Sequence, residues 1–166
     1  DSIIDGTVTS SITVAVVAIT SDDNFDAVAD QTVSVDTTDD DVAGFTIVEL
    51  EGATEVTEAG STDTFTVVLD AQPTSDVVIT VTPNDTTEVS TTGTLTFTPI
   101  NWDTAQSVTI TGVDDNLIDG TQTSTITISI IDAISDNSYD DVTDQTVSAT
   151  TTDDDVAGFT IVELDG

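Results

Sequence analysis

The stretch STDTFTVVL, residues 61–69, decides the fold of this chain. Its apolar residues Phe65, Val67 and Leu69 occupy alternate positions, so a β-strand would direct all three to one face of a sheet. The same alternation recurs at Val77, Ile79 and Val81, at Leu95 and Phe97, at Val108 and Ile110, and at Ile126, Ile128 and Ile130. The pattern predicts strands with one buried face.

Seven strands of this kind are predicted, separated by clusters of Gly, Pro, Asn and Asp. They cover Gly44–Leu50, Ser61–Leu69, Asp76–Thr82, Gly93–Thr98, Ser107–Val113, Thr123–Ile131 and Thr146–Thr152. No stretch has a convincing helical period. Seven strands in about 110 residues predict an all-β protein, a seven-stranded antiparallel immunoglobulin-like sandwich.

The chain also repeats itself. Residues 1–52 align without gaps to residues 115–166, and 33 of the 52 pairs are identical. This offset is too long for a solenoid turn and fits a whole domain. We therefore predict sandwiches in tandem: residues 42–155 as one complete domain, 1–41 as the sixth and seventh strands of a preceding repeat, and 156–166 as the first strand of a following repeat.

The charge of the chain is entirely of one sign, with 33 Asp and Glu and no Lys, Arg or His. Clustered carboxylates must therefore stay hydrated, hold a proton or bind a cation, for which Ca²⁺ is the natural choice. The charge argues against nucleic acid and anionic lipid as partners, since both need basic residues to meet their phosphates. No apolar run reaches about 18 residues, so membrane insertion is not expected.

Strand alternation gathers many of these acids at one end of the predicted sandwich, because alternate loops share an end. That end collects Glu51, Glu55, Glu58, Asp63, Asp85, Glu88, Asp114, Asp115, Asp119, Asp153, Asp154 and Asp155. In a tandem array it would face the acids at the other end of the next domain. Cations at the junctions would remove this repulsion, although charge runs can also be plain solvated linkers.

Four motifs in the predicted domain resemble those of the Calx-beta domain, a module of sodium–calcium exchanger regulatory loops and of giant bacterial surface proteins. They are VTEAG (56–60), LTFTP (95–99), VTITGVDD (108–115) and DDDVAG (153–158). The resemblance implies a β-sandwich that binds calcium between a glutamate, an acidic loop and a terminal Asp triple.

Carried over by motif, the implied ligands are Glu58, Asp114, Asp115, Asp119, Asp153, Asp154 and Asp155, with the Leu117 carbonyl as a backbone ligand. The repeat adds Asp1, Asp5, Asp39, Asp40 and Asp41. Two positions depart from the family pattern: Gln122 replaces an acid, and Glu88 is only the nearest candidate for another. We therefore expect one to three ions per junction. Taken alone, the loop of Asp114, Asp115 and Asp119 could also be an ordinary turn.

The residues offer little for catalysis, because His, Cys and Lys are absent, and no enzyme is expected. We expect a structural repeat of a giant extracellular or cell-surface protein, forming a calcium-rigidified stalk or filament, as an adhesin extender or matrix fibre. Its partners would be neighbouring repeats or identical chains in a fibre. The alternatives are a module that grips a glycan or mineral surface, and a self-assembling filament subunit with strand exchange.

Overall fold

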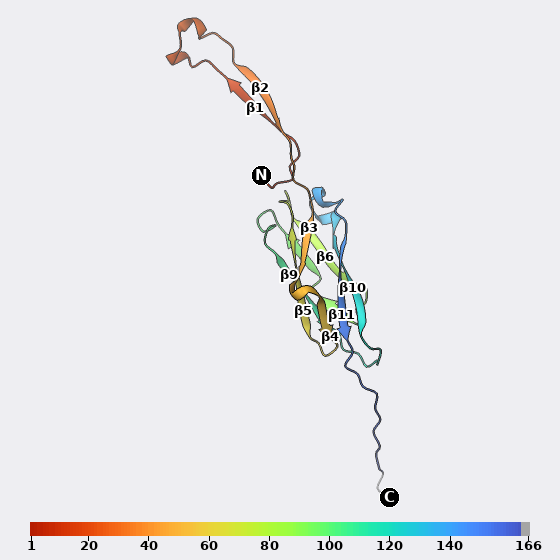
Figure 1. Ribbon diagram of the computed structural model, residues 1–166. Helices are drawn as coiled ribbons and strands as arrows, with labels where there is room; N and C mark the ends of the chain where they lie inside the picture. Colours follow the sequence, from red (N-terminus) through yellow and green to blue (C-terminus); the bar gives the residue numbers. More distant parts are fainter. Residues whose placement is uncertain (164–166) are drawn as a thin grey trace.

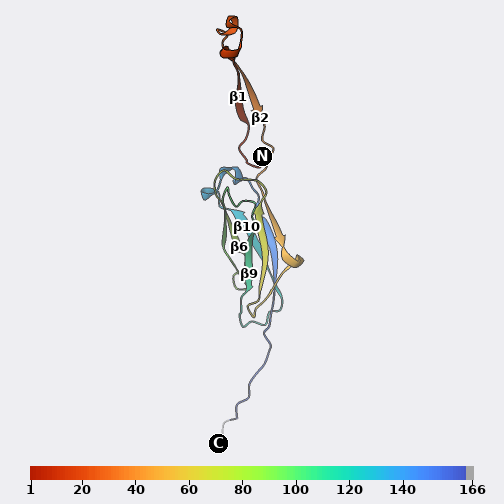
Figure 2. The same ribbon diagram turned by 90° about the vertical axis from the view of Figure 1, so that its left-hand side faces the viewer.

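A computed structural model describes residues 1–163 and shows an all-β chain. Figure 1 shows a β-hairpin at one end, a β-sandwich in the middle and an extended tail at the other end, and Figure 2 shows the same order from the side. The hairpin pairs β1 (Val8–Val14) with β2 (Gln31–Thr37). Among the described residues, no helix has the length and apolar character needed to cross a membrane.

Two sheets form the sandwich within residues 1–163: five strands in the order β4-β11-β10-β6-β8, and four in the order β3-β5-β9-β7. The strands are β3 (Phe45–Glu49), β4 (Thr54–Thr57), β5 (Thr62–Leu69), β6 (Val77–Pro83), β7 (Val89–Thr91), β8 (Thr94–Phe97), β9 (Gln106–Gly112), β10 (Gln122–Ile130) and β11 (Gln145–Thr152).

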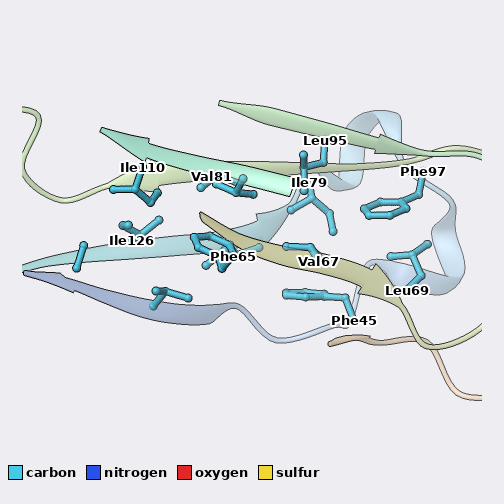
Figure 3. Close-up of a cluster of buried hydrophobic side chains, with 14 of the residues drawn as sticks. Phe45, Phe65, Val67, Leu69, Ile79, Val81, Leu95, Phe97, Ile110 and Ile126 are labelled. Carbon is cyan, nitrogen blue, oxygen red and sulfur yellow. The ribbon is translucent and has the colours of Figure 1, made fainter. Parts of the chain in front are cut away.

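The core lies between the two sheets and is built largely from the alternating residues that the sequence indicated, with further residues such as Phe45 and Tyr139. Phe65 and Val67 of β5 are fully buried and Leu69 nearly so. They face Ile79 and Ile126 of the five-stranded sheet (Figure 3). The predicted inward faces are confirmed, apart from Ile130, which is only half-buried. Burial of this apolar surface is the main force that holds the sheets together.

The prediction of seven antiparallel strands is wrong in its count and in its all-antiparallel pairing, because it missed two short strands of the described sandwich, β4 and β7. The first predicted strand is β3. After it the short 3-10 turn η3 (Leu50–Gly52) carries the chain to the other sheet, where β4 pairs in parallel with β11. The fourth predicted strand is β8, and β7 precedes it in the other sheet, with Gly93 between the two. Gly52 and Gly93 have φ of 94° and 86°, a conformation that glycine adopts without strain.

The hairpin repeats the structure of β10 and β11 as well as their sequence. Val8 pairs with Thr37 as Gln122 pairs with Thr151, which is the same register at the offset of the repeat. Its 3-10 turns η1 (Ala18–Thr20) and η2 (Asp23–Phe25) match η4 (Asp132–Ile134) and η5 (Asn137–Tyr139). Every residue of β1 and β2 is nevertheless exposed, because the hairpin has no second sheet among residues 1–163.

The tail was predicted to begin the first strand of a following repeat. Residues 156–163 form no strand within the part of the chain that the structure describes. The last three residues of that prediction, 164–166, lie outside the described residues. The assignment of residues 1–41 and 156–166 to neighbouring repeats therefore stays a prediction.

Candidate metal centre

Glu58 lies at the centre of the acidic end of the sandwich, in the turn that follows β4. Its backbone N–H donates to the carbonyl of Thr152, 3.1 Å away, so the end of β11 holds this turn in place. The end of β9 passes close by: a Cβ at Gly112 would collide with the carbonyl oxygen of Thr57. This packing leaves Glu58 only 1% exposed.

Four other acids converge on Glu58 from three separate segments of the chain. Carboxylate oxygens of Glu58, Asp115 and Asp155 lie within 4.8 Å of one another, and so do those of Glu58, Glu88 and Asp119. We refer to these five residues as the Glu58 cluster. Glu58 belongs to both groups, so its carboxylate joins the two halves of the cluster.

Several oxygens of the cluster are buried without a partner. Both carboxylate oxygens of Glu58, Oε2 of Glu88 and Oδ2 of Asp155 have no hydrogen-bond partner among residues 1–163. Buried polar groups of native proteins are almost always paired, and an unpaired buried charge is costly. These oxygens therefore require a proton or a cation.

The electrostatics of the cluster are those of crowded, desolvated carboxylates. Burial, and then the charge of Asp153, raises the pKa of Glu58. Burial, and then the charge of Asp119, likewise raises the pKa of Glu88. The pKa of Asp155 is also raised, by burial and then by Asp153. No Lys, Arg or His exists in the chain to offset this.

Asp153 has a different role, because it organises the backbone around the cluster. Its carboxylate accepts the N–H of Asp155 and the N–H of Gly120, each at 2.7 Å. These bonds lower the pKa of Asp153, the one to Asp155 most strongly. The β9–β10 loop and the end of β11 are thereby tied together, which brings Asp115, Asp119 and Asp155 to the same place.

The remaining predicted ligands lie at the edge of this site. Asp114 and Asp154 line, with Glu58, a hollow of about 320 Å³. Leu117 is 63% exposed, and its N–H donates to Oδ1 of Asp115 at 2.6 Å. The structure thus places all eight residues predicted from the motifs on this end of the sandwich. Four of them, Glu58, Asp115, Asp119 and Asp155, belong to the Glu58 cluster, and Glu88 is its fifth member.

Glu88 is the residue that the predicted ligand set left out. It precedes β7, a strand that the sequence analysis did not identify, and its side chain is only 6% exposed. Its position in the loop that shares an end with Glu58 was the available signal. Gln122, which replaces an acid of the family pattern, donates its side-chain amide to the carbonyl of Asp119 at 3.0 Å and so supports the loop.

The hairpin carries half of the same arrangement. Carboxylate oxygens of Asp39, Asp40 and Asp41 lie within 4.8 Å of one another. Asp39 accepts the N–H of Gly6 at 2.8 Å and that of Asp41 at 2.9 Å, as Asp153 does with its own neighbours. Asp1 and Asp5 line the same hollow, of about 230 Å³. We call these five aspartates the half-site, since residues 1–163 contain no counterpart of Glu58 or Glu88 for it.

The donor set of the Glu58 cluster fits calcium. Its donors are carboxylate oxygens, which hard cations such as Ca²⁺ prefer and which suit neither soft nor nitrogen-seeking metals. Calcium takes six to eight oxygens in flexible geometry, and five carboxylates with Asp114 and Asp154 beside them can supply most of these. The two unpartnered oxygens of Glu58 give such an ion a buried anchor.

Comparison with known proteins yields structural similarities only. No protein-family model and no curated protein matches the chain. The apo form of the Calx CBD1 domain is 17% identical with a TM-score of 0.45, covering 67% of this chain and 98% of its own. The E. coli chaperone DraB is 11% identical with a TM-score of 0.49, covering 70% and 59%.

A surface layer protein provides a third similarity. Domains 1–6 of SbsC are 20% identical with a TM-score of 0.43, covering 74% of this chain and 15% of that one. These values describe a distant likeness of fold.

Proposed function

We propose that this chain is a structural repeat of an extracellular protein, forming a stalk or filament whose joints are stiffened by calcium at the Glu58 cluster. The observation that carries the proposal is the Glu58 side chain, which is 1% exposed with both oxygens unpartnered within the described chain. A chain with no cationic side chain has no internal means of neutralising that group. An external divalent cation does so with the ligands already in place.

The ion would be held by residues from four separate segments. Glu58 follows β4, Glu88 precedes β7, Asp115 and Asp119 belong to the β9–β10 loop, and Asp155 follows β11. The ion supplies positive charge that cancels their mutual repulsion. Because these segments come from both sheets and include the exit of the chain, the proposed effect is to fix the direction in which the chain leaves the sandwich.

The extracellular setting follows from the same chemistry. A calcium site of ordinary affinity is filled only where calcium is plentiful, which favours the exterior of the cell. The many remaining carboxylates keep the surface hydrated and discourage lateral association. The absence of Lys and Arg also leaves a trypsin-like protease no cleavage site.

Calcium removal tests this proposal. Melting of the chain is followed by circular dichroism in millimolar calcium and in chelator, and its flexibility by small-angle X-ray scattering. Calcium should raise the melting temperature, since a ligand that binds only the folded state stabilises it by mass action. Calcium should also narrow the range of chain conformations that small-angle X-ray scattering detects.

Variants assign the effect to the site. Glu58→Gln combined with Glu88→Gln should abolish most of the calcium-induced shift. The control is Glu55→Gln, at an exposed position of β4, the strand that leads into the Glu58 turn. This variant should retain the calcium-induced shift. Identical melting curves with and without chelator in the unmodified chain would overturn the proposal.

A further inference from the structure

The segment between Asp1 and Asp5 of the half-site contacts the sandwich directly. The N–H of Ile4 donates to the carbonyl of Gln72 at 3.2 Å, and the N–H of Gln72 donates to the carbonyl of Ser2 at 2.6 Å. Ile3 and Gln72 form a parallel β-bridge. The joint between hairpin and sandwich is therefore a short piece of sheet.

The receiving turn between β5 and β6 is held rigidly. The side-chain amide of Gln72 donates to the carbonyl of Pro99 at 2.7 Å. Asp136 accepts the N–H of Thr74 at 2.7 Å and the N–H of Ser75 at 2.8 Å. Ile4 packs against the hydrophobic core of the sandwich beside this turn. The contact thus combines two backbone hydrogen bonds with burial of an apolar side chain.

The repeat places an equivalent segment at the opposite end of the sandwich, with nothing against it in the described chain. Ser2, Ile3 and Ile4 correspond to Asn116, Leu117 and Ile118, the segment between Asp115 and Asp119. Leu117 and Ile118 are 63% and 60% exposed, whereas their counterparts Ile3 and Ile4 are half-buried. The two loops are otherwise held alike: Ile3 donates its N–H to Asp1, as Leu117 does to Asp115.

We propose that Asn116–Ile118 is the surface on which a further copy of the repeat docks, through the backbone of the residue corresponding to Gln72 in that copy. The contact uses main-chain groups and one apolar side chain, so it tolerates the change from Ser2 to Asn116 and keeps isoleucine at position 118. The inference rests on the tandem arrangement proposed above, but not on calcium.

Calcium at the Glu58 cluster would act directly on the proposed docking segment. The docking residues lie between Asp115 and Asp119, which both belong to the Glu58 cluster. An ion bound to these two carboxylates fixes the ends of the segment whose backbone contacts the next domain. Ion binding and docking would then reinforce one another, because each orders the same five residues.

Disulfide trapping tests the docking surface, since the chain contains no cysteine of its own. Bridged strands bring Cα atoms about 4.8 Å apart, within the range that a disulfide spans. Ile3→Cys with Gln72→Cys in the 166-residue chain serves as the reference for the joint seen here. The test uses the chain extended by a second copy of residues 53–166, with Leu117→Cys and a cysteine at the position of the added copy that corresponds to Gln72.

The matched control replaces Leu117→Cys by Thr86→Cys, an exposed residue in another loop at the same end of the sandwich. Mild oxidation should close the Leu117→Cys pair at least about tenfold faster than the Thr86→Cys pair, because docking raises the effective concentration of its thiols. Equal rates in folded protein, or closure of the control alone, would overturn the proposal.

Each reaction is carried out in calcium and in chelator, which separates this proposal from the previous one. Fast closure in chelator supports docking even if calcium has no effect on melting. Slow closure in calcium overturns docking even if calcium raises the melting temperature. Fast closure that requires calcium supports docking and places the ion at the joint.

Discussion

The hairpin β1–β2 and the strand pair β10–β11 are two copies of one sequence in two environments. Their registers and 3-10 turns correspond residue by residue. Ile12 is 54% exposed, whereas its counterpart Ile126 is fully buried. Both copies have the same pairing and the same turns, whereas burial of the second copy comes from β4 and β6 beside the pair and from the opposite sheet.

The turns of the two copies diverge in the same way. Tyr139 is fully buried and donates its hydroxyl to the carbonyl of Ala71, and burial raises its pKa to about 12. Its counterpart Phe25 has no hydroxyl and is 57% exposed. One copy therefore connects its turn to the body of the sandwich, and the other shows the turn without that connection.

The sharpest test of this comparison removes the same side chain from both copies. Ile126→Ala should lower the free energy of unfolding by about 2–5 kcal/mol, because it leaves a cavity in a packed core. Ile12→Ala should change it by less than about 0.5 kcal/mol, as an exposed position does. Urea denaturation followed by circular dichroism measures both. Equal losses would mean that the hairpin is buried in solution, and the contrast drawn above would be wrong.

Asp136 and Asp22 provide a second matched pair, with a smaller expected effect. Burial by itself would raise the pKa of Asp136, but hydrogen bonds from Ser138, Thr74 and Ser75 outweigh it and lower the pKa. Asp136→Ala should cost about 2–3 kcal/mol, since hydrogen bonds to a charged group are strong. Asp22→Ala, which removes only a cap on the exposed η2 turn, should cost clearly less than Asp136→Ala.

The acid dependence of stability checks the same pair. A lowered folded-state pKa means that the contribution of Asp136 is complete above the ordinary value of 3.8 and is lost as the pH falls below it. Acid unfolding of Asp136→Ala should therefore be less steep over that range than that of Asp22→Ala. Parallel acid transitions for the two variants would contradict this assignment.

Calcium binding should distinguish the complete site from the half-site. Asp153→Asn disturbs the carboxylate that accepts the N–H groups of Gly120 and Asp155, so it should weaken calcium affinity at the Glu58 cluster by about 10–100-fold. Asp39→Asn makes the same change in the half-site and should leave the tighter binding event unaltered. Isothermal titration calorimetry measures both variants. A stronger effect of Asp39→Asn would reverse the ranking of the two sites.

The smallest expected effect concerns protons in the absence of calcium. The raised pKa of Glu58 means that the folded chain takes up a proton at a pH where the unfolded chain has lost it. In chelator the melting temperature should therefore rise as the pH is lowered towards the ordinary pKa of glutamate, and calcium should suppress this rise. Glu58→Gln should reduce the rise, whereas Glu55→Gln should not. An undiminished rise in Glu58→Gln would assign it to general charge neutralisation.

The sequence predicted the parts of the fold that depend on alternation and failed where the chain changes sheets. Phe65, Val67 and Leu69 mark their strand because every second side chain is apolar. Neither β4 nor β7 is long enough to show such an alternation, since each has four residues or fewer. Their positions are set by pairing with β11 and β9, which is a tertiary property.

The candidate site was predictable to a similar extent. Loop alternation indicated which acids share an end, and the structure brings Glu58, Asp115, Asp119 and Asp155 together there. The sequence could not show that Glu58 is buried, because that burial arises from the close approach of β9 and β11. Nor could it rank Glu88 above Asp114, since the ranking depends on how β7 begins.

The parallel pairing of β4 with β11 has a mechanical consequence. The chain enters the sandwich through β3, which continues into β4, and leaves it through β11. Tension applied to the two ends would slide β4 along β11, loading the rungs from Thr54–Ala149 to Thr57–Thr152 at once instead of unzipping them singly. The N–H of Glu58 donates to the carbonyl of Thr152 immediately beyond the last of these pairs, so this hydrogen bond would share the same load.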